Sequence, residues 1–269
     1  MIKHEPAEVV GIEILARQPN GAALARVTDV PDGSLVVVGS HVLLAASDPC
    51  GECEVCRRGG AAVCPRMQPR GDAWTARVST RFMVTLGDGL ELPMPAAAAV
   101  GGDIAIAYTL YARTGIAPRD PVVVIGDTAI TRFLVEILRA KGATPVVVTT
   151  NDDLSATAQR RGANVVADAS GVAAATESLG LGARPLRIIA TAPSSIAAEL
   201  AGPRATLTLL APALDVPASV IAREVTIIGV AGAHPDLITE AAAMCAKHEI
   251  DLVAGVGDGG TRARVLTRG

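Results

Sequence analysis

The chain has 269 residues, half of them hydrophobic, and its formal net charge is −3 at pH 7. This length allows one large domain or two of ordinary size, with enough apolar side chains for a full core. Only 2% of the residues are aromatic and no basic patch stands out, which argues against a protein that stacks nucleic-acid bases or neutralises phosphates.

The start of the chain does not resemble a signal peptide, because Lys3, His4, Glu5 and Glu8 stand where an apolar stretch would be needed. No apolar run approaches the roughly 18 residues of a membrane span. Four of the five cysteines are clustered, which favours a metal site in a reducing compartment over a set of disulfides. We therefore expect a soluble cytoplasmic protein that acts on a small molecule, with no nucleic-acid or membrane partner.

Short strands separated by turns are predicted in a first domain of residues 1–97. The strands are expected at 9–15, 23–27, 35–38 and 41–44, with two more between Trp74 and Thr85. Pro31-Asp32-Gly33 is a turn, since Pro presets φ and Gly permits a positive φ. Such closely spaced strands indicate a small β-barrel.

Helices and strands alternate in a second domain of residues 98–269. An Ala-rich helix at 95–114 leads into it from the first domain. Strands are then expected at 121–125, 145–150, 165–166, 186–190, 206–210 and 225–230. Helices are expected at 131–140, 154–161, 194–200 and 235–247. The alternation predicts a doubly wound parallel sheet of the nucleotide-binding type.

The most specific motif is formed by four cysteines, Cys50, Cys53, Cys56 and Cys64. The short steps between the first three bring their sulfurs to one centre, and the longer step to the last closes the fourth corner of the tetrahedron that zinc accepts. Gly51, Gly59 and Gly60 are expected to supply positive φ angles in the loop. Four protein ligands leave no open coordination position, so a structural zinc is predicted.

Two alternatives to zinc remain open for this motif. The first is an iron–sulfur cluster, because Pro65 follows Cys64 and a proline also follows the last cysteine of bacterial iron–sulfur motifs. The second is four ordinary buried cysteines, which chance rarely clusters in this way.

The segment from Cys50 to Cys64 resembles the structural zinc lobe of the zinc-type medium-chain dehydrogenases, the alcohol dehydrogenase-like superfamily. In that family the lobe follows a Gly-Asp-x-Val stretch, which here reads Gly39-Ser40-His41-Val42. A Leu-Pro pair, an Ala-rich helix and the dinucleotide fold come next, at Leu92-Pro93, 96–111 and 122–150. The resemblance covers roughly residues 20–255. It implies a shortened GroES-like β-barrel with a zinc lobe at 50–64, a Rossmann-like domain, and a homodimer joined through the Rossmann-like domains.

The catalytic zinc of that family is not expected here. No cysteine precedes Cys50, and Asn20 stands near the place of the family's histidine ligand. The third-ligand position falls at Gly101 or Gly102, which offer no side chain. His4-Glu5 resembles the family's Gly-His-Glu motif but lies too far before the cysteines.

The phosphate-binding fingerprint of the second domain is altered, because only the first glycine of Gly-x-Gly-x-x-Gly is kept. The turn reads Gly126, Asp127, Thr128, Ala129, Ile130 and Thr131. Thr128 is expected to crowd a pyrophosphate, and Asp127 adds a negative charge beside it. Thr150, at the ribose-reading end of the second strand, is neither the Asp that favours NAD nor an Arg that favours NADP. The helix N-terminus still offers free N–H groups, so NAD(P) is a possible cofactor that is predicted to bind weakly.

Weak candidates for acid–base chemistry are His234, Asp103 and Tyr108. Each has a plainer interpretation: His234 as a solvated loop residue, and Asp103 as a partner of the helix dipole. Cys245 lies on an apolar helix and is interpreted as a core residue rather than a nucleophile.

Two functions follow from the resemblance. The first is an oxidoreductase that lacks the catalytic zinc and acts on a carbonyl or alkene with NAD(P)H. The second is a degenerate member without redox activity, serving as a non-redox biosynthetic enzyme or a partner subunit. The altered fingerprint and the missing ligands keep both open.

Overall fold

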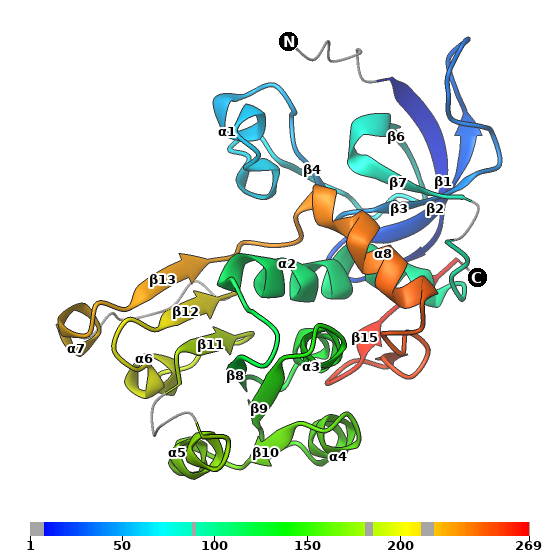
Figure 1. Cartoon of the computed structure of the whole chain (residues 1–269). Helices are drawn as coiled ribbons and strands as arrows, with labels where there is room; N and C mark the ends of the chain where they lie inside the picture. Colours follow the sequence, from blue (N-terminus) through cyan, green and yellow to red (C-terminus); the bar gives the residue numbers. More distant parts are fainter. Residues whose placement is uncertain (1–7, 88–89, 181–184, 211–217, 269) are drawn as a thin grey trace. The chain divides into compact units, whose positions relative to one another are not determined.

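The computed structural model describes residues 8–87, 90–180, 185–210 and 218–268, and the chain forms two compact units (Figure 1). Unit 1 comprises the chain up to Ala105 together with Ala233–Asp258 and the residues from Ala263 onward. Unit 2 comprises Ile106–Gly232 and Gly259–Arg262. The predicted fold class is confirmed, because unit 1 contains an antiparallel sheet and unit 2 a parallel Rossmann-like sheet. None of the described helices is long and apolar enough to cross a membrane.

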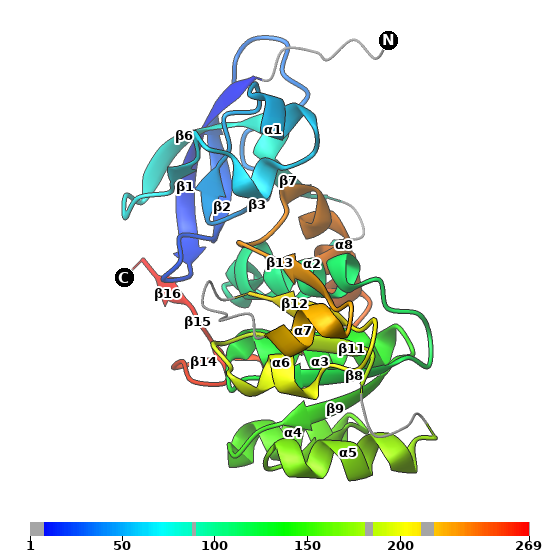
Figure 2. The ribbon, with the colours of Figure 1, turned by 90° about the vertical axis from the view of Figure 1, so that its left-hand side faces the viewer.

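The sheet of unit 1 has the strand order β16-β1-β2-β3-β7, and β6 also pairs with β1. Figure 2 shows β1, β2 and β3 side by side. Its strands are β1 (Val9–Arg17), β2 (Ala23–Asp29), β3 (His41–Leu44), β6 (Thr75–Ser79), β7 (Met83–Leu86) and β16 (Leu266–Thr267). Apolar residues alternate along β1, and Val10, Ile12 and Ile14 are fully or almost fully buried. This alternation places one face of the strand in the core of unit 1.

The predicted strand at 35–38 is wrong. These residues lie in the connection between β2 and β3, where Gly33 and Gly39 have φ angles of +80° and +92°. The end of the connection contacts β2, because Gly39 N–H donates to Val27 O at 2.8 Å. Leu35 is 89% exposed. Two glycine turns therefore override the strand preference of an apolar run.

Two short strand pairs and the short helical segments complete unit 1. The strand pairs are β4 (Ser47–Asp48) with β5 (Gln68–Pro69), and β14 (Val256–Gly257) with β15 (Ala263–Arg264). The helical segments are α1 (Glu54–Arg57), η1 (Ala61–Val63), η2 (Thr80–Phe82), η3 (Ala96–Ala99), η4 (Val100–Ile104), η5 (Pro235–Leu237) and α8 (Ile238–Ala246). The π-helix η4 joins the 3₁₀-helix η3 to α2 (Ala105–Thr114), so the predicted helix at 95–114 is three consecutive segments.

The sheet of unit 2 has six parallel strands in the order β10-β9-β8-β11-β12-β13. The strands are β8 (Pro121–Ile125), β9 (Thr144–Val148), β10 (Asn164–Val166), β11 (Arg187–Ala190), β12 (Thr206–Leu209) and β13 (Thr226–Gly229). The chain starts in the middle at β8, moves outward to β10, and returns to continue from β11. Because the direction reverses between β8 and β11, the carboxyl ends of these two strands define the crevice where such sheets bind ligands.

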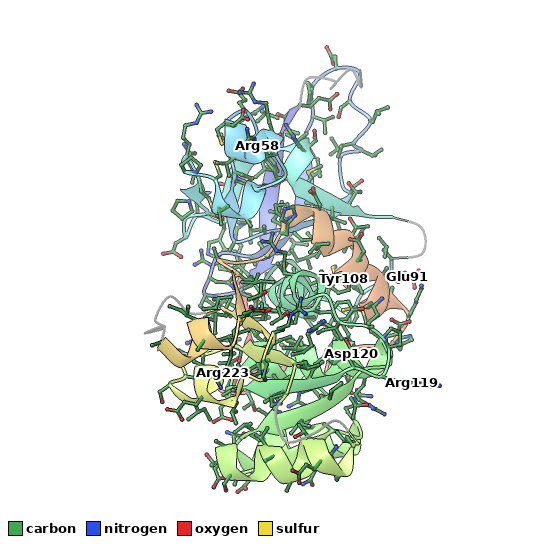
Figure 3. All side chains as sticks on the ribbon, turned by 60° about the vertical axis from the view of Figure 1, so that its left-hand side comes forward. Arg58, Glu91, Tyr108, Arg119, Asp120 and Arg223 are labelled. Carbon is green, nitrogen blue, oxygen red and sulfur yellow. The ribbon has the colours of Figure 1, made fainter. Side chains whose placement is uncertain are left out.

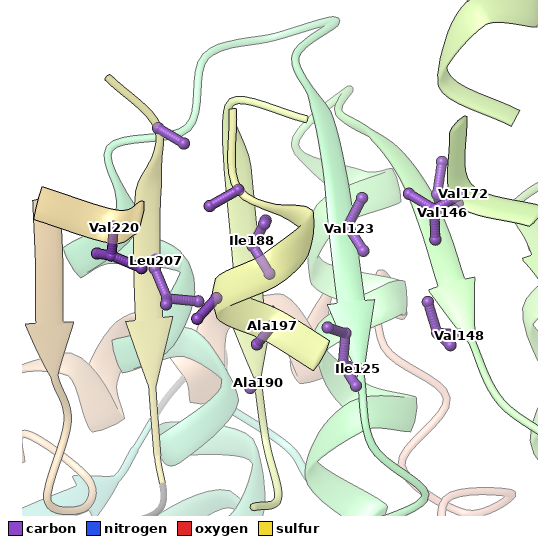
Figure 4. Packing of buried hydrophobic residues seen from close by; sticks show 13 residues of the cluster. Val123, Ile125, Val146, Val148, Val172, Ile188, Ala190, Ala197, Leu207 and Val220 are labelled. Carbon is purple, nitrogen blue, oxygen red and sulfur yellow. The ribbon is translucent and has the colours of Figure 1, made fainter. Parts of the chain in front are cut away.

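Helices cover both faces of this parallel sheet. On one face, α5 (Ala169–Ser178), α6 (Ile196–Leu200) and α7 (Ala218–Ala222) contribute Val172, Ala197 and Val220 to a core with the strand residues (Figure 4). On the other face, α3 (Ala129–Ala140) and α4 (Asp152–Arg160) pack against Val147.

The sequence interpretation did not include α5. Its start is marked by Asp168, whose carboxylate accepts from the N–H groups of Ser170 and Gly171. An N-cap aspartate before a run of Ala is a local signal that identifies this helix.

Candidate functional site

The structure brings the four sulfurs of the cysteine motif together in unit 1. The Sγ atoms of Cys50, Cys53, Cys56 and Cys64 all lie within 4.8 Å of one another, and among the described residues this is the one such cluster of metal-ligating side chains. The separations include 3.5 Å between Cys64 and Cys50, 3.8 Å between Cys53 and Cys64, and 4.0 Å between Cys50 and Cys56. None of the five cysteines forms a disulfide.

Local backbone geometry builds the loop around these sulfurs. Cys53 caps α1, and Cys56 lies on that helix, which bears Arg58 at its exposed end (Figure 3). Gly51 and Gly59 have the expected positive φ angles, but Gly60 does not, because its φ is −89°. Gly60 is needed for space instead, since a Cβ there would lie 2.7 Å from Val55 Cγ1.

Backbone N–H groups point at the sulfurs and favour thiolates. The N–H groups of Cys53 and Cys56 donate to the Sγ atoms of Cys50 and Cys53, each at 3.4 Å. The Glu52 N–H lowers the pKa of Cys50 to about 6. Burial raises the pKa of Cys56 to about 12 in the absence of a metal cation. A bound cation is the compensating charge that such a buried thiolate requires.

His234 contacts this cysteine segment from the far end of the chain. Its Nε2 lies 2.5 Å from Gly59 O, so Nε2 carries the hydrogen and donates it. Its Nδ1 lies 3.5 Å from the Asp236 carboxylate, and the side chain is 19% exposed. The imidazole therefore ties the segment after β13 to the cysteine loop.

Gln18 and Leu44 occupy the space beside Gly102 and Gly101, the two positions that correspond to the family's third catalytic ligand. A Cβ added to Gly102 would lie 1.8 Å from Gln18 Oε1, and one added to Gly101 would lie 2.2 Å from Leu44 O. Neither position has room for a side chain. Asn20, at the expected histidine place, uses its Oδ1 to accept from Ala22 N–H in a local turn. His4-Glu5 lies outside the described residues.

Asp103 lies on η4 and forms a reciprocal pair with Gln18. Gln18 Nε2 donates to Asp103 Oδ2 at 2.7 Å, and Asp103 N–H donates to Gln18 Oε1 at 3.0 Å. Burial raises the pKa of Asp103, and the amide hydrogen bond opposes that shift in part. The hydrogen-bond partner of the Asp103 carboxyl is thus a neutral amide and not a cation. Asp103 also lies in a π-helical segment, a feature that is frequent at functional sites.

The first βα turn of unit 2 retains the geometry of a phosphate-binding turn at its glycine. Gly126 has a φ of +132°, and a Cβ there would lie 2.4 Å from Thr191 Oγ1. Thr191 follows β11, so Gly126 sits at the reversal point of the strand order. A side chain at 126 would push the ends of β8 and β11 apart.

Thr128 and Thr131 stand at the positions of the other two glycines. Their hydroxyls form a connected set with the hydroxyl of Thr191. Thr128 caps α3 by accepting from Thr131 N–H, and Thr131 Oγ1 accepts from Thr128 N–H. The hydroxyls of Thr131 and Thr191 are 2.6 Å apart, and Thr191 donates to Ile125 O. Thr131 is fully buried. The hydroxyl of Thr128 thus turns inward, onto the helix end, and not into the crevice.

Asp127 points toward the second strand of the sheet. The Thr149 hydroxyl donates to the Asp127 carboxylate, and Asn151 N–H donates to Thr149 Oγ1 at 3.0 Å. β9 ends at Val148 rather than at the predicted residue 150, so buried Thr149 occupies the position expected for Thr150, which is exposed. Ala129 and Ile130 are the first two residues of α3, whose N–H groups have no acceptor within the helix.

The remaining candidates lie in packed positions. Tyr108 is 9% exposed, with Lys141 Nζ 5.7 Å from its ring centre. Cys245 is 4% exposed on α8. Sequence reasoning missed Gln18, Thr149 and Thr191, although a threonine directly after each of two central strands was a usable signal.

Comparisons with known proteins relate the whole chain to dehydrogenases at the level of fold. No family model and no curated sequence matches it. Among solved structures, alcohol dehydrogenase TADH from Thermus sp. ATN1 has a TM-score of 0.80 at 17% identity, over 94% of this chain and 85% of that one. D-arabinose dehydrogenase from Sulfolobus solfataricus has a TM-score of 0.78 at 16% identity, over 93% and 90%.

A third structure is described as a short chain alcohol dehydrogenase from E. coli CFT073 and is complexed with NADH. It has a TM-score of 0.78 at 17% identity, over 91% of this chain and 82% of that one. The chain therefore has the fold of these dehydrogenases, and this is the fold that its sequence resemblance predicted.

Proposed function

We propose that the protein is an oxidoreductase that uses a nicotinamide dinucleotide to reduce a carbonyl or alkene without a catalytic zinc. The observation that carries this proposal is the turn at Gly126, placed at the reversal point of a 3-2-1-4-5-6 parallel sheet. The dehydrogenase fold of the solved structures, one of which holds NADH, supports the same assignment.

The residues of the turn fit a dinucleotide. The N–H groups of Ala129 and Ile130 are free of intrahelical bonds, and the positive end of α3 favours a pyrophosphate there. Thr128 keeps its side chain away from that position by bonding to Thr131. When bound, a reduced nicotinamide supplies a hydride. The Thr131–Thr128 bonds occupy two N–H groups at the helix end, those of Thr128 and Thr131, so we expect binding weaker than low micromolar.

The packing around Gly101 and Gly102 supports chemistry without a catalytic metal. Gln18 fills the space of a side chain at 102, and Leu44 O fills that at 101. Among the described residues of unit 1, a zinc-activated alkoxide, which simple alcohol oxidation requires in this type of protein, therefore has no ligand set.

A structural zinc is proposed for the four-cysteine cluster. Four sulfurs at about 2.3 Å from one zinc stand roughly 3.8 Å apart, and the three separations of 3.5–4.0 Å agree with this value. A cluster of several irons needs its cysteines farther apart, since each binds a different corner of the cluster. The geometry favours a single ion.

The proposed reaction is tested with a panel of carbonyl compounds, activated alkenes and alcohols, each assayed with NAD(H) and NADP(H) with and without added zinc. We expect reduction of at least one carbonyl or alkene, unaffected by zinc, and no oxidation of simple alcohols. Gly126→Ala should abolish turnover, because its Cβ meets Thr191. Gly115→Ala is the matched control, since Gly115 also has a positive φ but nothing within 4 Å of an added Cβ. Zinc-dependent alcohol oxidation contradicts the proposal.

A redox-inactive protein is the second candidate, and the threonine set favours it. The hydroxyls of Thr128 and Thr131 accept from N–H groups at the helix end that glycines would leave available to a ligand. Calorimetric titration separates the two candidates. Absence of binding for every nicotinamide nucleotide supports the role of a non-redox enzyme or partner subunit.

We further propose a homodimer joined through the sheet of unit 2 and a cytoplasmic location. β13 is an edge strand of the sheet, and its residues are largely exposed, with Ile227 39% exposed. An unpaired, exposed edge strand is a template for pairing with another chain. A reducing compartment is consistent with five cysteines that form no disulfide.

A further inference from the structure

Asp127 stands between the carboxyl ends of two adjacent strands of unit 2. Ile125 and Val148 are partners in the register of β8 and β9, and Asp127 and Thr149 follow them directly. The Thr149 hydroxyl donates to Asp127 Oδ1, while the carboxylate itself remains exposed. Thr149 is in turn fixed by Asn151 N–H. The carboxylate is therefore held in place and open to solvent.

A carboxylate held in this way can bind a diol. An ionised carboxylate offers about four lone-pair sites, and Thr149 uses one of them. The others can accept from two neighbouring hydroxyls of a ribose. In dinucleotide-binding sheets the adenosine ribose lies at the carboxyl end of the second strand, which here is β9. The residues that follow β9, Thr149 and Thr150, carry only hydroxyls.

The charges around this position disfavour a phosphate on the ribose. Asp152 and Asp153 lie in the first turn of α4, next to Thr149. Arg132 and Arg262 reach this turn, but both pair with Asp153, at 3.2 Å and 3.5 Å. A 2′-phosphate would therefore meet the Asp127 carboxylate where NADP-binding proteins provide an arginine.

We propose that Asp127 binds the adenosine ribose hydroxyls and makes the site selective for NAD(H) over NADP(H). The acid thus comes from the loop after the first strand instead of the end of the second. This inference rests on the proposed binding of a nicotinamide dinucleotide, and it assigns the carboxylate a favourable role where its position in the fingerprint predicted an unfavourable one.

The test is calorimetric titration of the full-length parent and Asp127→Asn with NAD⁺, NADP⁺, adenosine 5′-monophosphate and adenosine 2′,5′-bisphosphate. The last two lack the nicotinamide half and differ from each other only by the 2′-phosphate. We expect the parent to prefer NAD⁺ over NADP⁺ by about tenfold or more, the effect of one charged hydrogen-bonding group. Asp127→Asn keeps an acceptor for Thr149 but removes the charge. The variant should reduce the preference for NAD⁺ over NADP⁺ by about tenfold. It should reduce the preference for the 5′-monophosphate over the 2′,5′-bisphosphate by the same factor.

Two controls separate the ribose contact from general effects. Glu177→Gln makes the same change of net charge at an exposed position of α5 and should leave the preference for NAD⁺ unchanged. Thr149→Val keeps the charge but removes the hydroxyl that holds it, and should weaken NAD⁺ binding about threefold. Equal affinities of the parent for NAD⁺ and NADP⁺ overturn the inference and leave the proposed function standing. Failure of all four ligands to bind overturns both.

Discussion

At the scale of single residues, Asp103 is a carboxyl in a packed position whose partner is the Gln18 amide. Burial raises its pKa above the ordinary value of about 3.9. The folded state therefore binds the proton more tightly than the unfolded chain. The stability that this proton confers is fully present below about pH 3.9 and is lost as the pH rises through the raised pKa.

This linkage predicts the behaviour of Asp103→Asn. The asparagine is neutral at every pH and can still accept from Gln18 Nε2. We expect a melting temperature a few degrees above that of the parent at pH 7.5, with the difference disappearing near pH 4. Thermal melts over this range measure it. Asp32→Asn, in the exposed connection after β2, is the control and should show no such difference. A variant that is less stable at both pH values would contradict the prediction.

At the scale of elements, the cysteine segment has little secondary structure of its own to stabilise it. α1 has four residues and η1 has three. Isolated helices this short are unstable in water. Two hydrogen bonds, between His234 and Gly59 O and from Arg81 Nη1 to Gly51 O, join the segment to the rest of unit 1. A metal ion bound by the four cysteines would stabilise this loop, because metal binding contributes directly to the free energy of folding.

Elemental analysis of protein purified without added metal should find one zinc per chain. Cys53→Ala should lose it and melt far below the parent, because structural zinc contributes on the order of 10 kcal/mol in small zinc domains. Cys245→Ala is the matched control, since this buried thiol lies on α8 outside the cluster. It should retain the zinc. Two zincs, iron in place of zinc, or a Cys53→Ala variant as stable as the parent would show that the assignment is wrong.

At the scale of the whole molecule, β13 forms an edge of the parallel sheet in the described part of unit 2. In a monomer, the outward backbone N–H and C=O groups of this strand would have to hydrogen-bond with water. Among the described residues, β12 is the one strand that pairs with β13. Ile227, at its centre, is 39% exposed, and Ile221 on the neighbouring α7 is 74% exposed. A two-fold axis beside this strand would pair each edge with its equivalent and bury both isoleucines.

Ile227→Lys should convert a dimeric parent into a monomer, because an inward charge blocks edge-to-edge pairing. Light scattering coupled to size-exclusion chromatography measures the mass. Val253→Lys makes the same change at a position that is 65% exposed in unit 1, and it should remain dimeric. A parent that is monomeric at micromolar concentration contradicts the proposal.

The sequence by itself determined most of the elements and the cysteine cluster, because both follow from short-range patterns. The buried strand at 121–125 and the helix that follows it appear as apolar runs and periods of a few residues. The cysteine spacing predicted a cluster whose members the structure brings within 4.8 Å of one another. The exception at 35–38 shows the limit, since two glycine turns outweigh an apolar run.

Only the tertiary structure decided what surrounds each candidate side chain. Thr131 meets Thr191 across 60 residues of sequence, and Gln18 meets Asp103 across 85. No local pattern encodes such contacts, because they depend on which strands become neighbours and where each strand ends. β9 ends two residues earlier than predicted, and this shift brings Thr149 to Asp127. A carboxylate that the sequence placed beside a pyrophosphate is thereby turned toward the carboxyl end of β9, where we propose that the ribose binds.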